Sequence, residues 1–315
     1  MSYTVIRPKD RNEWLRQREK GIGSSEVGTI LGLNPFETPY QLWRRKKGLD
    51  APKQESFAMK AGHYLEDAVS LFYHDETGKD IIKRSAGDWL IADDEKPFLR
   101  VSPDRTYWIP DMPKNDHNKG ILECKTTQME IDENSVPQHW FAQLQYQLGV
   151  AGLPQGALAW LTQGRKFGFK DFMFDKEFYG WMIEEVTKFW TDCIIGNQEP
   201  LPVNVDDVLL KYPGHVAGKT VTATDELAEE CRRLKELKEE MACNDNRKKE
   251  LEAAIKMAMG DAEALVDPAT SRPIATWKAA KGRTCFDEKK FAAENPALYS
   301  EYQYTKAGNR MFLVK

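Results

Sequence analysis

The sequence predicts an α/β fold in which a mixed β-sheet is flanked by helices. Two segments, 56–77 and 137–151, carry apolar residues at helical spacing and indicate amphipathic helices. Short apolar segments lie between and after these helices and predict strands. The clearest are 97–101, 120–125, 156–162 and 166–174. Helices and strands that alternate in this way are typical of an α/β architecture. We therefore expect residues 1–205 to form one α/β core.

The composition is that of a soluble globular protein. Of the 315 residues, 41% are hydrophobic and 30% are charged, which leaves ample material for a core. The sequence has no run of about 18 apolar residues, so it predicts no membrane span. Its first ten residues lack the apolar segment of a signal peptide. We expect a cytoplasmic protein with no membrane partner.

The net charge and the cysteines restrict the ligands that the chain is expected to bind. Proteins that coat nucleic acid are usually basic, so a net charge of −4 argues weakly against that class. A net charge of −4 is still compatible with a single basic channel, because the carboxylates of a metal site count as negative until a metal ion binds. The five cysteines form no C-x-x-C pair, which favours reduced thiols and argues against a structural zinc.

The most informative segments are S-P-D at 102–104 and E-C-K at 123–125. Side chains two residues apart in a strand point to the same face, so we expect Glu123 and Lys125 to project together while Cys124 points into the core. Two adjacent strands that bring Asp104 and Glu123 to a common edge make a hard-oxygen site, which suits Mg²⁺ or Mn²⁺. A lysine beside such a site holds or deprotonates a water molecule, or neutralises a phosphate.

An isolated E-x-K in a strand is more often a solvated salt bridge, but here it does not stand alone. A helix with the pattern G-x-x-x-E, from Gly62 to Glu66, lies upstream of it. A helix with the pattern Q-x-Q lies downstream and contains Gln143, Gln145 and Gln147, which cannot all share one helical face. Together these segments favour a metal-dependent phosphodiesterase.

The set of motifs resembles a known family. The segments G-I-G-S-S-E-V, L-G-L-N-P-F-E-T-P-Y-Q-L-W, A-G-H-Y-L-E-D, S-P-D, E-C-K and Q-L-Q-Y-Q, within residues 10–195, are similar to the YqaJ-type viral recombinase family. That family is close to phage lambda exonuclease and lies within the PD-(D/E)xK nuclease superfamily. The resemblance implies a restriction-endonuclease-like core and an exonuclease that degrades duplex DNA ends with Mg²⁺, for which Mn²⁺ can substitute.

The resemblance also implies how the site works. One or two metal ions would be held by Glu66, Asp104, Glu123 and the backbone carbonyl of Cys124. Lys125, aided by Gln143, would position and activate the attacking water. The implied direction is 5′→3′, which leaves 3′ single strands for a phage single-strand annealing protein. A homo-oligomer in the form of a ring-shaped trimer, encoded by a phage or prophage and working in the bacterial cytoplasm, is implied as well.

A second group of residues is a candidate phosphate site. Small residues, including Ser24 and Ser25, open the helix that follows Gly23 and leave backbone N–H groups free, while Arg18 lies one turn upstream. Taken alone, the residues favour an ordinary capped helix with Ser25 near its N-cap. The resemblance places Arg18, Ser24 and Ser25 where lambda-type exonucleases hold a DNA phosphate.

The remaining segments leave alternatives open. The basic run 44–47 either faces DNA or complements the dipole of its own helix. We expect residues 206–224 to be a linker and 225–315 a small α+β extension of unknown role. In the extension we predict a helix from 225 that breaks at 244–246, a β-hairpin and a final strand at 310–314. Alternative functions are a structure-selective endonuclease or nickase on the same core, or a DNA-end-binding module that recruits a partner.

Overall fold

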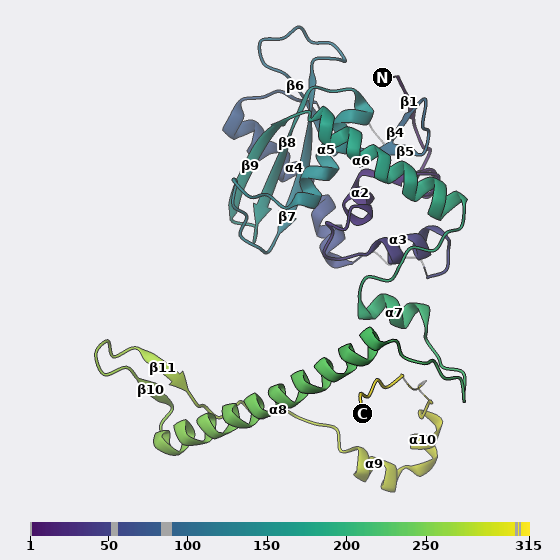
Figure 1. Cartoon of the computed structure of the whole chain (residues 1–315). Coiled ribbons are helices and arrows are strands. Elements are labelled where there is room, and N and C mark those ends of the chain that lie inside the picture. The colour runs from purple at the N-terminus through teal and green to yellow at the C-terminus, as the bar shows by residue number, and fades with distance from the viewer. Residues whose placement is uncertain (1, 52–55, 83–89, 306–307, 309) are drawn as a thin grey trace. The chain divides into compact units, whose positions relative to one another are not determined.

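The structure is a computed structural model that describes residues 2–51, 56–82, 90–305, 308 and 310–315 (Figure 1). It consists of two compact units, Met1–Lys211 and Tyr212–Lys315. No helix within the described residues is long and apolar enough to span a membrane. The sequence Ala-Gly-Asp at 86–88 also predicts a turn, and this segment lies outside the described residues.

The main sheet of the first unit has five strands in the order β3-β6-β7-β8-β9. Strands β7 and β8 are parallel, and the other neighbouring pairs are antiparallel, so the sheet is mixed. The five strands are β3 (Ile81–Ile82), β6 (Arg105–Trp108), β7 (Lys119–Thr127), β8 (Gln155–Thr162) and β9 (Lys166–Met173).

Helices cover both faces of this sheet, as the period-two pattern of its buried residues requires. Helix α4 (Phe57–Thr77) packs Val69 and Tyr73 against one face, where Ala157 and Leu161 of β8 form a small core. Helix α5 (Gln138–Ala151) covers the opposite face, where the alternate residues of β8 join the larger core. The prediction of an α/β core with a central mixed sheet flanked by helices is confirmed (Figure 1).

A second sheet supports the N-terminal part of the same unit. Its order is β1-β4-β5-β2, and only β2 and β5 run parallel. The hydroxyl of Tyr146 on α5 donates to the carbonyl of Ile22 on β2 at 2.9 Å, which joins this sheet to the main core. The elements of this region are β1 (Tyr3–Ile6), α1 (Arg11–Glu19), β2 (Ile22–Gly23), α2 (Ser24–Ile30), α3 (Pro39–Lys46), β4 (Leu90–Asp93) and β5 (Leu99–Val101).

The first unit ends in helices, and part of the predicted linker belongs to it. Helix α6 (Lys176–Lys188) continues into a π-helical segment, η1 (Phe189–Ile195). Helix α7 (Val205–Lys211) then occupies the start of the segment 206–224 that was predicted to be a linker. Its Asp207 is fully buried and accepts hydrogen bonds from the hydroxyl of Thr38 at 2.9 Å and from the backbone N–H of Val203 at 3.0 Å. These bonds explain why the chain does not behave as a linker there.

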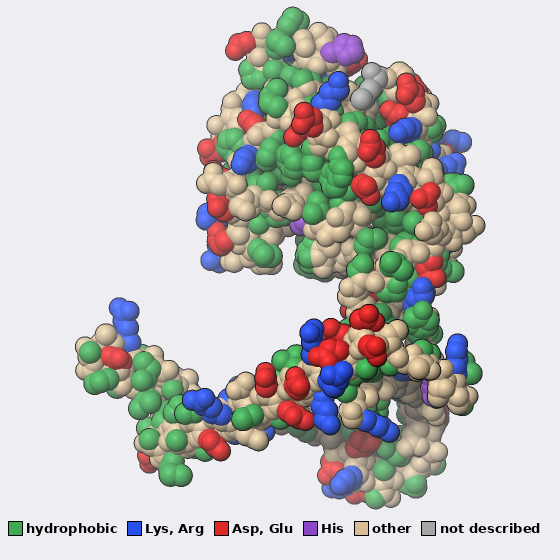
Figure 2. All heavy atoms as spheres, viewed as in Figure 1, with side chains coloured by type: hydrophobic (Ala, Val, Ile, Leu, Met, Phe, Trp, Pro, Cys, Tyr) green, Lys and Arg blue, Asp and Glu red, His purple; other side chains and the backbone are tan. Residues whose placement is uncertain are grey.

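The second unit is built on one long helix, α8 (Asp225–Met259). It runs without interruption through 244–246, so the predicted break is wrong. Acidic and basic side chains are interspersed along it (Figure 2). The predicted hairpin is confirmed, but residues 310–314 form no strand, so that prediction is wrong as well. The other elements are β10 (Ala264–Val266), β11 (Pro273–Thr276), α9 (Glu288–Glu294) and α10 (Pro296–Glu301).

Candidate active site

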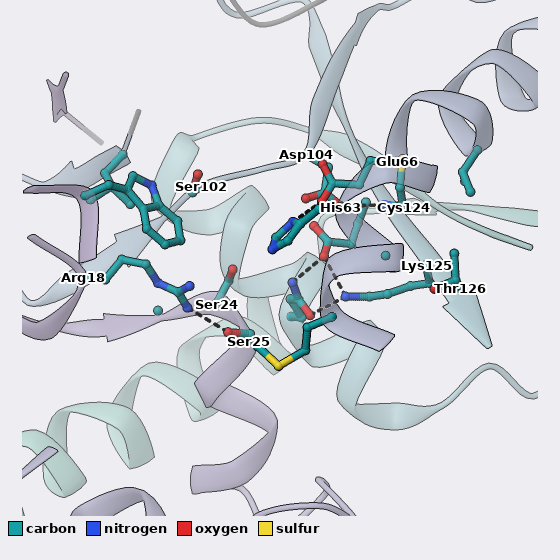
Figure 3. Close-up of a pocket in the computed structure, with 18 of the residues that line it drawn as sticks. Arg18, Ser24, Ser25, His63, Glu66, Ser102, Asp104, Cys124, Lys125 and Thr126 are labelled. Atoms are coloured by element: carbon teal, nitrogen blue, oxygen red, sulfur yellow. Dashed lines mark hydrogen bonds and ion pairs between the residues drawn. The ribbon is translucent and has the colours of Figure 1, made fainter. Parts of the chain in front are cut away.

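One cavity of about 520 Å³ brings the predicted site residues together. Carboxylates and Lys125 lie on one side of it, and Arg18 and the serines of α2 lie across from them (Figure 3). Elements from both sheets therefore contribute to one site. The cavity is lined by every residue that the sequence proposed for it: Arg18, Ser24, Ser25, Glu66, Asp104, Glu123, Cys124, Lys125 and Gln143.

Strand β7 orients its residues as its alternation predicts. The ammonium of Lys125 donates to Glu123 Oε1 at 2.7 Å, and the Glu123 side chain is almost completely buried. The Cys124 side chain packs on the other face with Val69 and Tyr73. Burial raises the pKa of the Cys124 thiol well above its ordinary value, so the side chain stays neutral. The prediction that Cys124 points away from Glu123 and Lys125, into the core, is confirmed.

Asp104 lies directly before β6, the strand next to β7. Its Oδ2 accepts a hydrogen bond from the backbone N–H of Cys124 at 2.8 Å, which fixes the carboxylate at the shared edge of the two strands. Burial raises the pKa of Asp104 well above its ordinary value, and the nearby carboxylates of Glu123 and Glu66 raise it further. Asp104 therefore holds a proton more readily than a solvated carboxyl does, as expected where buried carboxylates lie close together.

Glu66 reaches the cavity from α4 and has partners that the sequence reasoning missed. His63 lies one turn earlier, and its Nδ1 is 3.0 Å from Glu66 Oε1. Arg105 Nη1 lies 3.8 Å from Glu66 Oε2. The spacing of His63 and Glu66 on one helix was a usable signal, because residues three apart are neighbours on a helix surface. The Arg105 contact had none, because it depends on how α4 packs against β6.

Two glutamines of α5 complete the shell around Glu123. Gln143 donates to Glu123 Oε1 and accepts from the Lys125 ammonium at 2.9 Å. Gln147 donates to Glu123 Oε2 at 2.9 Å. Gln145 points away and donates to the carbonyl of Met173, so the prediction that the three glutamines do not share a face is confirmed. Gln147 was missed, although residues four apart on a helix lie on one face.

The N-terminal side of the cavity holds Arg18 against α2. Its Nη2 donates to the hydroxyl of Ser25 at 3.0 Å, and a Cβ at Gly23 would lie 3.0 Å from the same nitrogen, so the guanidinium and the glycine are in close approach. Glu26 accepts from the backbone N–H of Gly23 at 2.8 Å and closes the first turn of the helix. Burial lowers the pKa of Arg18, although the Glu26 carboxylate opposes this. Arginine has an ordinary pKa far above neutrality, so it remains charged.

The basic run at 44–47 serves the packing of α3. Arg44 pairs with Asp50, Arg45 with Glu26 and Glu37, Lys46 with Glu26, and Lys47 donates to the backbone carbonyl of Ile194. All four side chains are therefore committed to bonds within the first unit. This favours a structural role over the DNA-facing alternative.

The carboxylates suit a divalent cation by their chemistry, although they are not preassembled as a ligand cage. Among the residues that the structure describes, no three His, Cys, Asp or Glu side chains are grouped as metal ligands. Both oxygens of Glu123 instead accept bonds from Lys125 and the two glutamines. Glu66, Asp104 and Glu123 nevertheless line one cavity, and a cation there would relieve the repulsion that raises the pKa of Asp104. Carboxylate oxygens are the ligands that Mg²⁺ and Mn²⁺ prefer.

Comparison with known proteins finds relatives over most of the chain. Residues 13–154 match the YqaJ-like viral recombinase domain. The uncharacterized protein YqaJ of Bacillus subtilis (strain 168) is 31% identical over 264 residues, which are 80% of this chain and 79% of that protein. Among solved structures, the alkaline exonuclease LHK-Exo from Laribacter hongkongensis is 16% identical with a TM-score of 0.46, covering 59% of this chain and 93% of that one. A phage related exonuclease from Haemophilus somnus 129PT is 12% identical with a TM-score of 0.39, covering 56% and 96%.

Proposed function

Since the chain belongs to the YqaJ-like viral recombinase family, we propose that it is a metal-dependent DNA exonuclease. It hydrolyses phosphodiester bonds from the ends of duplex DNA in the 5′→3′ direction. The product is a 3′ single strand, which a phage single-strand annealing protein pairs with a complementary strand. A ring-shaped homotrimer that encloses the duplex would keep the enzyme on its substrate.

One observation carries this proposal: Asp104, Glu123 and Lys125 meet in a cavity, with Gln143 against both members of the ion pair. A lysine held by a carboxylate and an amide at 2.7 Å and 2.9 Å is positioned to orient a water molecule toward a phosphate. Glu123 and Asp104 raise the pKa of Lys125 against the effect of its burial, so the resting ammonium is charged. In that form it binds the water and stabilises negative charge on the phosphate, and transfer of a proton would require that its carboxylate neighbours be neutralised.

Glu66, Asp104, Glu123 and the backbone carbonyl of Cys124 are the proposed metal ligands. Bound Mg²⁺ supplies charge stabilisation for the phosphate and the leaving oxygen, and Mn²⁺ substitutes for it. Glu123 Oε2 accepts a bond from Gln147, and a carboxylate oxygen has two lone pairs, so this oxygen could bind a metal ion while the amide continues to hold it.

Arg18, Ser24 and Ser25 are proposed to bind the 5′-terminal phosphate of the DNA. Arg18 bonds to the Ser25 hydroxyl, and among the described residues no carboxylate lies within ion-pair distance of it, although Glu26 is near enough to raise its pKa. The contrast with Arg44 and Arg45, which pair with acids of their own unit, supports a ligand-binding role. A guanidinium flanked by two hydroxyls supplies the donors that a phosphate requires.

The test is digestion of linear duplex DNA labelled at one 5′ end, with Mg²⁺, comparing 5′-phosphate with 5′-hydroxyl ends. We expect rapid release of 5′ mononucleotides, faster from phosphorylated ends and abolished by EDTA and by Lys125→Ala. A closed circular duplex is the control, because an exonuclease that needs an end leaves it intact. Cleavage of the circle would instead favour the endonuclease or nickase. Binding of ends without any cleavage would favour the recruiting module.

Metal binding separates the roles of the two β7 residues. Lys125→Ala should still bind Mg²⁺ but lose cleavage, because the ligands remain while the water loses its anchor. Glu123→Ala should lose both. Calorimetry checks the metal directly, and unchanged Mg²⁺ binding by Glu123→Ala would refute the ligand assignment.

A further inference from the structure

Gln147 connects two parts of the cavity that are far apart in sequence. Its side-chain amide nitrogen donates both to Glu123 Oε2, at 2.9 Å, and to the hydroxyl oxygen of Ser24, at 3.2 Å. The residue is fully buried on α5. One nitrogen therefore joins a proposed metal ligand on β7 to a proposed phosphate-binding residue on α2.

The carboxylate of Glu123 fixes which way the amide points. If the amide were reversed, its oxygen would face the carboxylate at hydrogen-bond distance, which is repulsive. The nitrogen must therefore face Glu123, and the oxygen is left behind. Within the part of the chain that the structure describes, Gln147 Oε1 is buried without a hydrogen-bond partner. A buried acceptor without a partner is destabilising, and such groups call for a functional explanation.

The same bond determines what Ser24 can do. A hydroxyl has one proton to donate and lone pairs that accept. Because Ser24 accepts from Gln147, its own proton is available for another acceptor, and the residue lines the cavity. An anionic phosphate oxygen in the cavity is the acceptor that matches it.

We propose that Gln147 is a positioning residue that couples the phosphate side of the cavity to the metal side. It orients Ser24 as a donor to a DNA phosphate and at the same time holds the carboxylate of Glu123. This inference rests on the proposed function, because both sides of the cavity take their roles from it. Since coupling between two bound ligands is reciprocal, a phosphate at Ser24 and a divalent cation at Glu123 should each strengthen the binding of the other.

The chain offers a matched control in Gln145. It is a buried glutamine on the same helix, and both its amide atoms bond to backbone, the nitrogen to the carbonyl of Met173 and the oxygen to the N–H of Asp175. Unlike those of Gln147, these partners do not line the cavity. Gln147→Met and Gln145→Met each remove one buried amide and keep the length of the side chain, so only the first should affect the coupling.

The experiment measures binding of a short labelled duplex by fluorescence anisotropy, with Ca²⁺ in place of Mg²⁺. Each protein is tested with 5′-phosphate and with 5′-hydroxyl ends. We expect the preference of the wild type for the phosphate to fall about 10-fold or more in Gln147→Met, the range seen when the support of a metal ligand is removed. Gln145→Met should keep the preference, and circular dichroism establishes that each variant is folded.

A second variant keeps the test decisive if Gln147→Met does not fold. In the wild type the phosphorylated end should raise the affinity for Ca²⁺, measured by titrating the ion into the complex. Ser24→Ala should abolish this increase, because a bound phosphate is then no longer connected to Glu123 through the Ser24 hydroxyl and Gln147. Retention of the increase in Ser24→Ala, or of the phosphate preference in folded Gln147→Met, overturns the inference.

The proposed function and the role of Gln147 can be refuted separately. Wild-type protein that neither binds nor cuts duplex ends would refute the proposed function, and this inference with it. Wild-type cleavage at duplex ends combined with unaltered behaviour of the Gln147 and Ser24 variants would refute the inference alone.

Discussion

Glu26 and Glu123 are both buried glutamates that pair with a lysine, and their exposed fractions are 6% and 3%. They differ in the charges that surround them. Glu26 lies between α2 and α3 and meets Lys46 at 2.8 Å and Arg45 at 3.0 Å. Burial raises the pKa of Glu26, but Lys46, Arg45 and Arg18 outweigh it and the pKa is lowered. This carboxylate is fully balanced by cations of its own unit.

Glu123 has one cation, Lys125, and two neutral amides, and it shares its cavity with further carboxylates. The repulsion appears at Asp104, whose pKa is raised by burial and by these neighbours. The comparison teaches that burial of a charge does not by itself mark a functional site. A balanced network stabilises the fold, whereas a network with excess negative charge is suited to an external cation.

Replacing the lysine at the unbalanced site should have the largest effect. Lys125→Ala is expected to slow DNA cleavage about 10²- to 10⁴-fold, because the group that holds and orients the reacting water is lost. Single-turnover digestion of a labelled duplex measures this. A variant that is folded by circular dichroism and retains more than a tenth of wild-type activity would contradict the role of Lys125.

Replacing the lysine at the balanced site should instead affect stability. In Lys46→Ala, Glu26 loses an ion pair and the carbonyl of Gly21 loses a donor at 2.6 Å. Because Glu26 keeps its pair with Arg45, the loss of unfolding free energy should be smaller than the about 3–5 kcal/mol that a buried charge without any partner costs. Urea denaturation measures the loss. If Lys46→Ala proves as stable as the wild type but fails to bind DNA, the structural reading of the basic run is wrong.

The sequence could predict the part of the site that depends on local periodicity. Strand alternation separated Glu123 and Lys125 from Cys124, and the helical period separated Gln143 from Gln145. The long helix 225–259 was predicted to break at its asparagines, but the helix propensity of Asn is only about 0.7 kcal/mol per residue worse than that of Ala. That penalty is too small to end a helix of 35 residues.

The rest depends on contacts between distant segments, which periodicity does not encode. The bond from Gln147 to Ser24 joins residues 123 positions apart, and the one from Thr38 to Asp207 joins residues 169 apart. The role of the run 44–47 was open for the same reason, because its partners lie on other elements. A strand at 310–314 would have required a neighbouring strand, and an apolar segment alone does not supply one.

Divalent metal should distinguish the two glutamates next. Added Mg²⁺ or Mn²⁺ is expected to stabilise the wild type by about 2.7 kcal/mol at a hundred times its Kd. Glu123→Gln should lose this increase in melting temperature, because it removes a ligand. Lys46→Ala should show the same metal-dependent increase, starting from a lower melting temperature, because the substitution leaves the proposed metal ligands unchanged. An equal metal-dependent increase in the wild type and Glu123→Gln, measured by calorimetric melting, would place the cation elsewhere.

The smallest effect is expected at Arg44, whose ion pair is more exposed than those of Glu26. Arg44 pairs with Asp50 at 2.8 Å, with side-chain exposures of 18% and 34%, so solvent screens the pair more than it screens Glu26. Arg44→Ala should therefore cost about 0.2–1 kcal/mol of unfolding free energy. It should leave the affinity for duplex ends unchanged, which anisotropy titration checks at two salt concentrations. A weaker affinity with a reduced salt dependence would mean that Arg44 contacts a DNA phosphate, because each such contact releases counterions.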